Sequence, residues 1–315
     1  MVCFKPILHK INLSNKYCKE RSDYFRQNAV NANFSSSTSW IILNDIEQSI
    51  KAKIEAIGTP LKDWDINIYR GILTGYNEAF IIDGKKKDEL ISADPKSGEI
   101  IRPILRGRDI QKYSYNYDNL YLLNIHNGIK EKGIKAVNIN DFSAIKTYLD
   151  NYYPQLEKRS DKGDTPYNLR NCAYMEDFSK QKIVWGEISD KTKFCIELEG
   201  SFVTEATTFF MVGDSLLYLI GYLNSKLSQY IFSKIGTTTG VGTVRWKKFT
   251  VEQLPVPKLP PNRESKYVEI SEKIILLKSQ HKSSQALEGI IDSMIYEDFN
   301  FTNQEIEFIE NQKCQ

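Results

Sequence analysis

Apolar residues recur at helical spacing near the start of the chain, after a polar segment that covers residues 1–39. From Trp40 to Ile57 they return every three or four positions, and the run stops at Gly58, with Pro60 close behind. A glycine just past a helix and a proline shortly after it are typical stop signals. The pattern predicts an amphipathic helix over residues 40–57, preceded by a loosely ordered segment.

The middle of the chain contains short apolar runs separated by turn residues, a pattern that predicts strands. Between the two groups of runs we expect a helix over 141–153, ending at Pro154, and a polar charged loop over 157–170. The aromatic residues within the runs, and Cys195, are expected in the core; the aromatics are Trp185, Phe194, Phe202, Phe209 and Phe210. The expected strands are 66–69, 79–82, 119–125, 182–188, 194–198 and 207–212.

A long apolar helix is expected over 215–234, from a cap at Asp214 and Ser215 to the Gly/Thr-rich loop 236–243. The prolines of 254–261 then favour extended backbone and exclude helix. Apolar residues at helical spacing beyond them predict a terminal helical arm. The expected fold class is α+β, with a mostly β body and inserted helices (40–260), flanked by an N-terminal helix and a C-terminal helical arm (261–315).

Composition is that of an ordinary globular protein, with 315 residues, 41% hydrophobic residues and a formal charge of +2. No apolar run approaches the roughly 20 residues that a membrane helix needs, and the first ten residues lack the apolar core of a signal peptide. We therefore expect a cytoplasmic protein with no membrane partner.

The near-neutral charge hides an uneven distribution. Residues 261–315 hold 6 basic and 10 acidic residues, so of the 42 Lys+Arg and 40 Asp+Glu of the whole chain, residues 1–260 hold 36 and 30. Residues 1–260 are therefore at +6 and the arm at −4. A basic excess outside the arm fits a polyanionic partner.

Motifs for several chemistries are absent from the sequence. Five cysteines without a C-x-x-C pair and three distant histidines argue against a disulfide framework or a zinc site. There is no phosphate-binding Gly-Lys-Ser/Thr, no Gly-rich loop of the kind that holds S-adenosylmethionine (SAM), and no Asn/Asp/Ser-Pro-Pro-Tyr/Phe tetrapeptide for a flipped base. The nearest match to a metal-dependent nuclease, Glu264 to Lys266, opens a predicted helix and favours a solvated face. We expect no catalytic and no metal site, although nucleophilic sets that meet only in space stay open.

Three segments combine basic side chains with glycine turns and aromatics: 69–80, 101–117 and 236–248. Arginines and small hydroxyl or amide side chains supply donors for phosphates and base edges. Each segment also fits a ligand-free interpretation: a hairpin, a structural ion pair through Asp109, and a polar turn with solvated lysines. The candidate DNA-binding residues are Arg70, Thr74, Asn77, Arg106, Arg108, Lys112, Arg245, Lys247 and Lys248.

Seven segments, taken in order, carry a family resemblance: Trp40 with its helix, 58–64, 70–80, 102–109, 182–189, 223–226 and 249–257. Together they resemble the TaqI-like C-terminal specificity domain, the target-recognition part of adenine-specific DNA methyltransferases and of fused type II restriction-modification enzymes. The resemblance covers about residues 40–260, most of the chain.

This resemblance implies sequence-specific recognition of double-stranded DNA in a restriction-modification or related phage-defence system, beside a methyltransferase or restriction partner domain or subunit. SAM would bind that separate domain, so no cofactor is expected on this chain. The helical arm offers an apolar stripe to a partner helix, and a helix-mediated dimer is a further expectation. Two alternatives stay open: an assembly subunit that works through its C-terminal helices, and a complete enzyme with a site that the sequence does not reveal.

Overall fold

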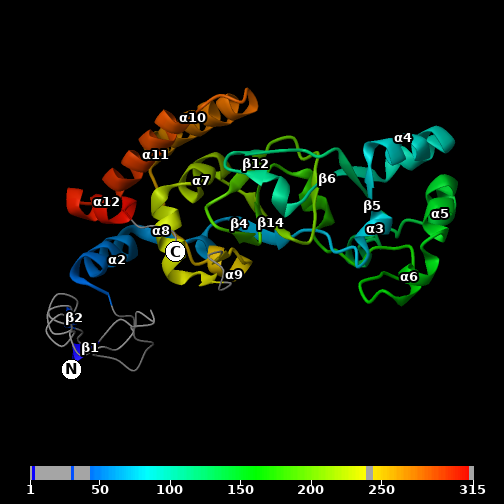
Figure 1. Cartoon of the computed structure of the whole chain (residues 1–315), viewed down its shortest axis with the longest axis horizontal. Helices are drawn as coiled ribbons and strands as arrows, with labels where there is room; N and C mark the ends of the chain where they lie inside the picture. The colour runs from blue at the N-terminus through cyan, green and yellow to red at the C-terminus, as the bar shows by residue number, and fades with distance from the viewer. Residues whose placement is uncertain (1, 4–29, 32–42, 239–243, 312–315) are drawn as a thin grey trace, which may run out of the picture.

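The computed structural model describes residues 2–3, 30–31, 43–238 and 244–311, and they form the expected α+β fold. The molecule is elongated (Figure 1). Helices from both ends of the chain gather at one end, sheets occupy the middle, and a smaller group of helices lies at the other end. Most of the expected loosely ordered segment 1–39 falls outside the described residues.

The central sheet has the strand order β12-β10-β14-β4, with every neighbouring pair antiparallel. Its two faces contribute to two different hydrophobic cores: Ile183 and Trp185 belong to one, and Val184 and Phe210 to the other. Both faces of β10, β12 and β14 are buried, so these three strands appear in the sequence as nearly continuous apolar runs, whereas Asn67 and Arg70 of the edge strand β4 are exposed. The strands are β4 (Ile66–Arg70), β10 (Lys182–Gly186), β12 (Phe194–Glu197) and β14 (Thr208–Gly213).

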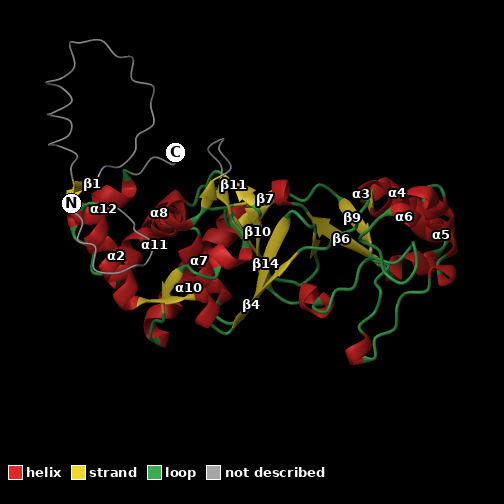
Figure 2. Ribbon diagram, turned by 90° about the horizontal axis from the view of Figure 1, so that it is seen from below, coloured by secondary structure: helices red, strands yellow, loops and turns green. Residues whose placement is uncertain are grey.

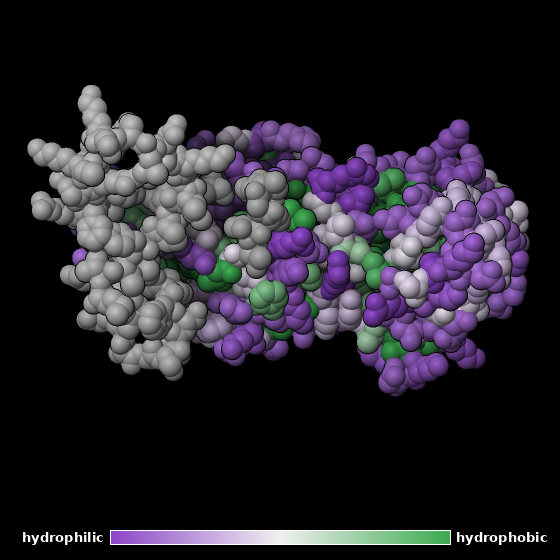
Figure 3. All heavy atoms as spheres, turned by 60° about the horizontal axis from the view of Figure 1, so that its bottom comes forward, coloured by the Kyte–Doolittle hydropathy of each residue, from purple (hydrophilic) through white to green (hydrophobic). Residues whose placement is uncertain are grey.

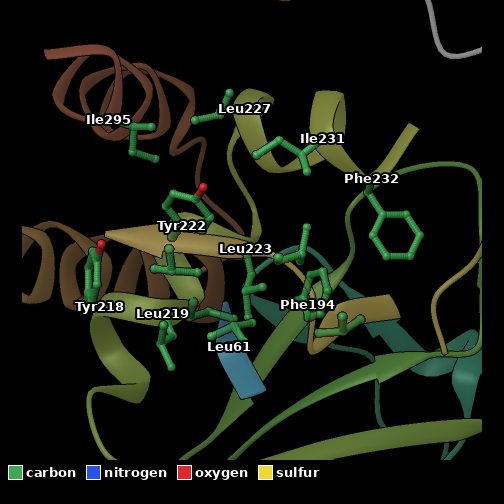
Figure 4. Packing of buried hydrophobic residues seen from close by; sticks show 14 of the residues in the cluster. Leu61, Phe194, Tyr218, Leu219, Tyr222, Leu223, Leu227, Ile231, Phe232 and Ile295 are labelled. Carbon is green, nitrogen blue, oxygen red and sulfur yellow. The ribbon is translucent and has the colours of Figure 1, made fainter. Parts of the chain in front are cut away.

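Helices from both halves of the chain form most of the first core on one face of this sheet, and the short α9 (Lys248–Val251) adds Val251. Side chains from α7, α8 and α11 meet in a single cluster (Figure 4). The Tyr218 hydroxyl donates to the carbonyl of Pro257 at 2.8 Å, which ties the proline-rich connector to α7. The other helices are α2 (Asp45–Ile57), α7 (Leu216–Leu223), α8 (Lys226–Ile235), α10 (Pro261–Ser279), α11 (Gln285–Asp298) and α12 (Asn303–Glu310).

A second sheet, β13-β6-β9-β5, shares the other core with four short helices. Strand β13 runs parallel to β6, while β9 is antiparallel to both of its neighbours. The strands are β5 (Ile81–Asp83), β6 (Ile101–Leu105), β9 (Leu120–Leu123) and β13 (Val203–Thr204). The helices are α3 (Asn77–Phe80), α4 (Gly84–Ala93), α5 (Ser143–Asp150) and α6 (Tyr153–Lys158).

Short elements complete the described fold. The remaining strands are β1 (Val2–Cys3), β2 (Val30–Asn31), β3 (Gly58–Pro60), β7 (Ile110–Gln111), β8 (Ser114–Tyr115), β11 (Ile188–Ser189), β15 (Thr237–Thr238), β16 (Val244–Arg245) and β17 (Pro255–Pro257), and α9 covers Lys248–Val251. Single 3-10 turns are η1 (Leu61–Asp63), η2 (Pro95–Glu99), η3 (Gly107–Asp109), η4 (Lys130–Lys132), η5 (Ile139–Asp141) and η6 (Met175–Ser179).

Several elements differ from the sequence-based expectation. The predicted helix 215–234 is two helices, because the Asn224 amide interrupts it and hydrogen-bonds to both the N–H and the carbonyl of Phe194. The predicted strand 79–82 is instead the end of α3 followed by β5, and α4 was missed. Asp83 caps α4 by accepting from the N–H of Lys86. Pro154 lies in the first turn of α6, where proline is well tolerated.

The packing predictions have clearer outcomes. Trp185, Phe194, Phe209 and Phe210 are buried as expected, and so is Cys195. Phe202 is half-buried, against the edges of Tyr115 and Tyr117. No helix among the described residues is long and apolar enough to span a membrane. The domain boundary at 260 stays a prediction; the arm contributes Tyr267, Ile274 and Ile291 to the same core as α7.

One ion pair lies within the central sheet. The Lys182 ammonium is 2.5 Å from the Glu197 carboxylate, and the two side chains are 0% and 1% exposed. Lys182 also donates to the carbonyl of Phe178 at 2.7 Å, while Glu197 accepts from the N–H of Glu199 at 3.0 Å. The pair therefore ties the loop before β10 and the loop after β12 to the sheet. Burial of Lys182 lowers the pKa of its ammonium group.

We expect Glu197→Gln to leave the Lys182 charge buried without a counterion, and so to reduce the free energy of unfolding by roughly 3 kcal/mol. Urea denaturation measures the effect. Glu199→Gln, an exposed change two residues away, should leave the midpoint nearly unchanged. Equal midpoints for the two variants would show that the buried pair contributes little.

A second carboxylate links α12 to α2. Glu305 accepts from the Lys53 ammonium at 2.7 Å and from the Ser49 hydroxyl at 2.6 Å. Burial opposes ionisation of Glu305, but these hydrogen bonds and those from Thr302 outweigh it and lower its pKa to about 2.

Because the folded-state pKa of Glu305 lies below its unfolded value, its stabilisation is complete above pH 4.5 and is lost as the pH falls toward 2. We expect Glu305→Gln to remove roughly 3 kcal/mol at pH 7 and much less at pH 2.5. Urea unfolding at the two pH values tests this, with the exposed Glu307→Gln as the control. A loss for Glu305→Gln that does not depend on pH would contradict the assignment.

Candidate nucleic-acid interface

The loop 204–208 brings three distant segments of the chain together. The carbonyl of Thr207 accepts from the N–H of Glu187 at 2.8 Å, and its hydroxyl accepts from the N–H of Gly107 at 3.4 Å. The N–H of Gly71 donates to the carbonyl of Thr208 at 3.0 Å. The ends of β4 and β10 and the turn η3 therefore meet here, and β7, β10 and β11 lie close together in Figure 2.

One of these contacts requires glycine, and another is tight. A Cβ at Gly71 would lie 2.0 Å from the carbonyl oxygen of Glu205, so no side chain fits there. Gly107 and Gly186 also pass closely, and a Cβ at Gly186 would lie 3.3 Å from the carbonyl oxygen of Gly107. This close approach of the backbones positions the side chains next to the glycines, Arg70, Arg108 and Glu187.

Arg70, Glu187 and Arg245 form what we call the Arg–Glu–Arg cluster. One carboxylate oxygen of Glu187 lies 3.3 Å from Nη2 of Arg70, and the other lies 3.4 Å from Nη1 of Arg245. The Glu187 side chain is 17% exposed, whereas those of Arg70 and Arg245 are 53% and 42% exposed. The carboxylate thus holds two arginines that still face solvent.

A cleft of about 650 Å³ lies beside this cluster. Glu187 and Arg245 line it together with Arg108, which is exposed and makes no ion pair with a described residue. Lys193 also lines the cleft, 3.2 Å from Asp190. Ile188, 54% exposed, adds an apolar surface. The cleft therefore combines an exposed arginine without an ion pair to a described residue, positive charges held by ion pairs, and an exposed apolar side chain.

The polar residues of the first candidate segment support the loops of the site. Thr74 is 1% exposed, and its hydroxyl donates to the side-chain oxygen of Asn77. The exposed Asn77 donates to Glu205 at 3.0 Å, and Glu205 accepts from the Thr207 hydroxyl at 2.6 Å. These contacts hold loop 74–77 against loop 204–208. A direct role of Thr74 or Asn77 in DNA binding stays a prediction.

A buried arginine, Arg159, supports loop 74–77. Arg159 is 7% exposed, lies over the Phe80 ring at 4.5 Å and donates to the carbonyls of Thr74, Asp161 and Asn168. Burial lowers the pKa of its guanidinium to about 10. The charge pattern of 157–170 predicts only a polar loop and does not single out Arg159.

Arg106 forms ion pairs with two carboxylates of the chain itself. It makes two hydrogen bonds to Asp109, at 2.7 and 3.0 Å, and lies 2.6 Å from Asp118. Its side chain is 12% exposed, and that of Asp109 is 5% exposed. The ion pair through Asp109, expected as the alternative interpretation, is present and fixes the turn η3. Contact of Arg106 with DNA stays a prediction.

Of the three candidate lysines, Lys112 lies apart from the other two. Lys112 is 2.6 Å from Glu288 of α11 and lines a different cleft, which also contains Lys226. Lys247 is half-buried, and the exposed Lys248 lies 3.6 Å from Glu252. The ring of Trp246 stacks on Phe232, and the backbone N–H of Trp246 donates to the carbonyl of Glu187. In the sequence, Lys247 and Lys248 therefore lie two and three residues after Arg245 of the Arg–Glu–Arg cluster, whereas Lys112 lines a different cleft.

The described residues include no group of three or more His, Cys, Asp or Glu that could hold a metal ion. Glu264 and Lys266, the nearest sequence match to a nuclease site, lie in the first turns of α10 and are half-buried and exposed, respectively. What the described part of the site offers is therefore hydrogen-bond donors, charges and shape.

We expect Gly71→Ala to push loop 204–208 away from β4 and to reduce the free energy of unfolding by about 1–3 kcal/mol. Gly289→Ala is the matched control: a Cβ there meets nothing within 4 Å, and alanine favours helix α11. Thermal unfolding of both variants tests this. A Gly71→Ala protein as stable as Gly289→Ala would show that the close approach at Gly71 tolerates a side chain.

Residues 102–256 match the sequence model of the TaqI-like C-terminal specificity domain, which confirms the family resemblance. The matched region contains Arg108, Glu187 and Arg245, while Arg70 precedes it. The chain is also similar to the structure of the Type IIL restriction-modification enzyme MmeI in complex with DNA, with 13% identity and a TM-score of 0.62 over 80% of this chain and 35% of that one.

A further similar structure is the type IIG restriction endonuclease BpuSI, with 14% identity and a TM-score of 0.47 over 81% of this chain and 33% of that one. At 13% identity the likeness to MmeI shows a shared fold. This chain spans about a third of the length of either structure.

Proposed function

We propose that this chain recognises target sequences in double-stranded DNA for a restriction-modification enzyme or a related phage-defence system. The observation that carries the proposal is that Arg108 and Arg245, from two distant segments, line one cleft, while Arg70, from a third segment, pairs with Glu187 of the same cleft. Two of the three arginines lie in the region that matches the TaqI-like specificity domain. The MmeI structure, which has the same fold, was determined with DNA.

The charges of the chain suit such a partner. Binding to DNA gains free energy when arginines and lysines neutralise phosphates and release counterions. Residues 1–260 carry a formal charge of +6, and the face shown in Figure 3 is mostly hydrophilic with small separate hydrophobic areas. Arg108 is exposed and makes no ion pair with a described residue, so its guanidinium is available to bind a phosphate.

Chemistry on the DNA belongs, in this proposal, to a methyltransferase or endonuclease domain on the same chain or on a partner. SAM would bind that domain. An interaction role for the helical arm is a second candidate, supported by Leu276 of α10 and Ile290 of α11, which are 57% and 46% exposed. A helix-mediated dimer is one form that this interaction would take.

We expect Arg108→Ala to weaken binding to duplex DNA and to make the slope of log K against log [salt] less steep by about 0.9, the contribution of one phosphate contact. Lys86→Ala removes one positive charge from α4, far from the cleft, and should leave the slope unchanged. Fluorescence anisotropy with a labelled duplex at several salt concentrations measures both variants.

Arg106→Ala is unsuitable as this test because it leaves the buried Asp109 without its partner and perturbs the fold. If the wild-type chain shows no salt-sensitive DNA binding, alone or with a methyltransferase encoded beside it, the proposed function is wrong. Equal slopes for Arg108→Ala and Lys86→Ala would remove Arg108 from the interface.

A further inference from the structure

We propose that the Arg–Glu–Arg cluster reads a G·C base pair in the major groove, with an arginine donating to guanine and Glu187 accepting from the amino group of cytosine. This inference rests on the proposed function and goes further, because it names Glu187, which the sequence analysis did not select, as a specificity-determining residue. It also names the base pair that the residue reads.

The first support is the way in which Arg70 is held. Its Nε donates to the carbonyl of Ala206 at 2.8 Å, and its Nη2 lies 3.3 Å from Glu187, so the plane of the guanidinium is fixed at two points. Nη1 makes no hydrogen bond with a described residue. The outer edge of the guanidinium therefore keeps free N–H groups, and a fixed arginine edge matches the N7 and O6 acceptors of guanine.

The second support is the sign of the charges. A phosphate that approached Arg70 or Arg245 at this point would also approach the carboxylate of Glu187, which lies between them. A base edge differs from a phosphate because it presents donors and acceptors side by side. A G·C pair offers acceptors on guanine and an amino donor on cytosine, the complement of an arginine next to a glutamate.

The third support is that Glu187 is fixed by its backbone as well as by its ion pairs. Its N–H donates to the carbonyl of Thr207 at 2.8 Å, and its carbonyl accepts from the N–H of Trp246 at 2.7 Å. The pair formed by Arg106 and Asp109 is a useful contrast: both of those side chains are nearly buried, whereas the arginines of the cluster are about half exposed. The cluster is therefore both fixed and accessible.

The test is selection of bound duplexes from a randomised DNA library by the full chain, followed by sequencing. We expect the wild type to select a motif with a cytosine that Glu187→Gln no longer prefers. The preference at that position should fall roughly tenfold or more and shift toward adenine, because glutamine pairs with the N6 and N7 of adenine. Glu89→Gln, which removes the same charge from α4 near Lys86, should select the wild-type motif.

Each outcome separates the two proposals. A wild type without salt-sensitive binding would overturn the proposed function. A wild type that binds without base preference, a Glu187→Gln protein that selects the unchanged motif, or one that binds every sequence more tightly by the same factor would overturn the base-reading role alone. Should Glu187→Gln fail to fold, Arg70→Lys keeps the positive charge but loses the planar guanidinium edge that matches guanine. The same selection with Arg70→Lys should then lose the preference for the G·C pair, and an unchanged motif would overturn the base-reading role.

Discussion

Burial of β10, β12 and β14 on both faces of the central sheet is the constraint on which the rest of the structure depends. Alternate residues of β10, such as Val184 and Trp185, enter different cores, so neither face is open to a polar side chain without a partner. Lys182, the charge that does lie within the sheet, is matched by Glu197 on the neighbouring strand. Charged residues that face solvent are consequently restricted to the strand ends, and Arg70 and Glu187 occupy such positions.

The position of the site follows from how the chain crosses between sheets. Strand β13 ends at Thr204 in the second sheet, and β14 begins at Thr208 in the central sheet, so three residues make the crossing. Their backbone groups bond to segments of both sheets, and Gly71 provides the space for this approach. The arginines and Glu187 thus project from a junction held by main-chain hydrogen bonds, which are more rigid than contacts between long side chains.

Local signals in the sequence predicted much of this fold. Doubly buried strands such as 182–188 and 207–212 were recognisable as apolar runs, and the ion pair through Asp109 was foreseeable because its partners are three residues apart. The break at Asn224 was not predictable, since it depends on the backbone of Phe194, thirty residues away. Glu187 was missed for the same reason: its partners lie 117 and 58 residues from it in the sequence. Its position directly after a buried strand was the one local signal, and that signal does not reveal a partner.

The arginines of the site differ in how far their charge is already matched, and this difference bears on recognition. Arg106 is saturated by two carboxylates, Arg70 and Arg245 share one, and Arg108 has none among the described residues. An unmatched arginine attracts any phosphate and so adds affinity for every sequence. An arginine that shares a carboxylate gains less binding free energy from a phosphate, because the carboxylate repels the phosphate. It loses no binding free energy at a base edge that offers an acceptor to the arginine and a donor to the carboxylate. If the chain recognises DNA as proposed, partial neutralisation therefore lowers binding to non-target DNA more than binding to a matching site, and a difference between the two affinities is what specificity requires.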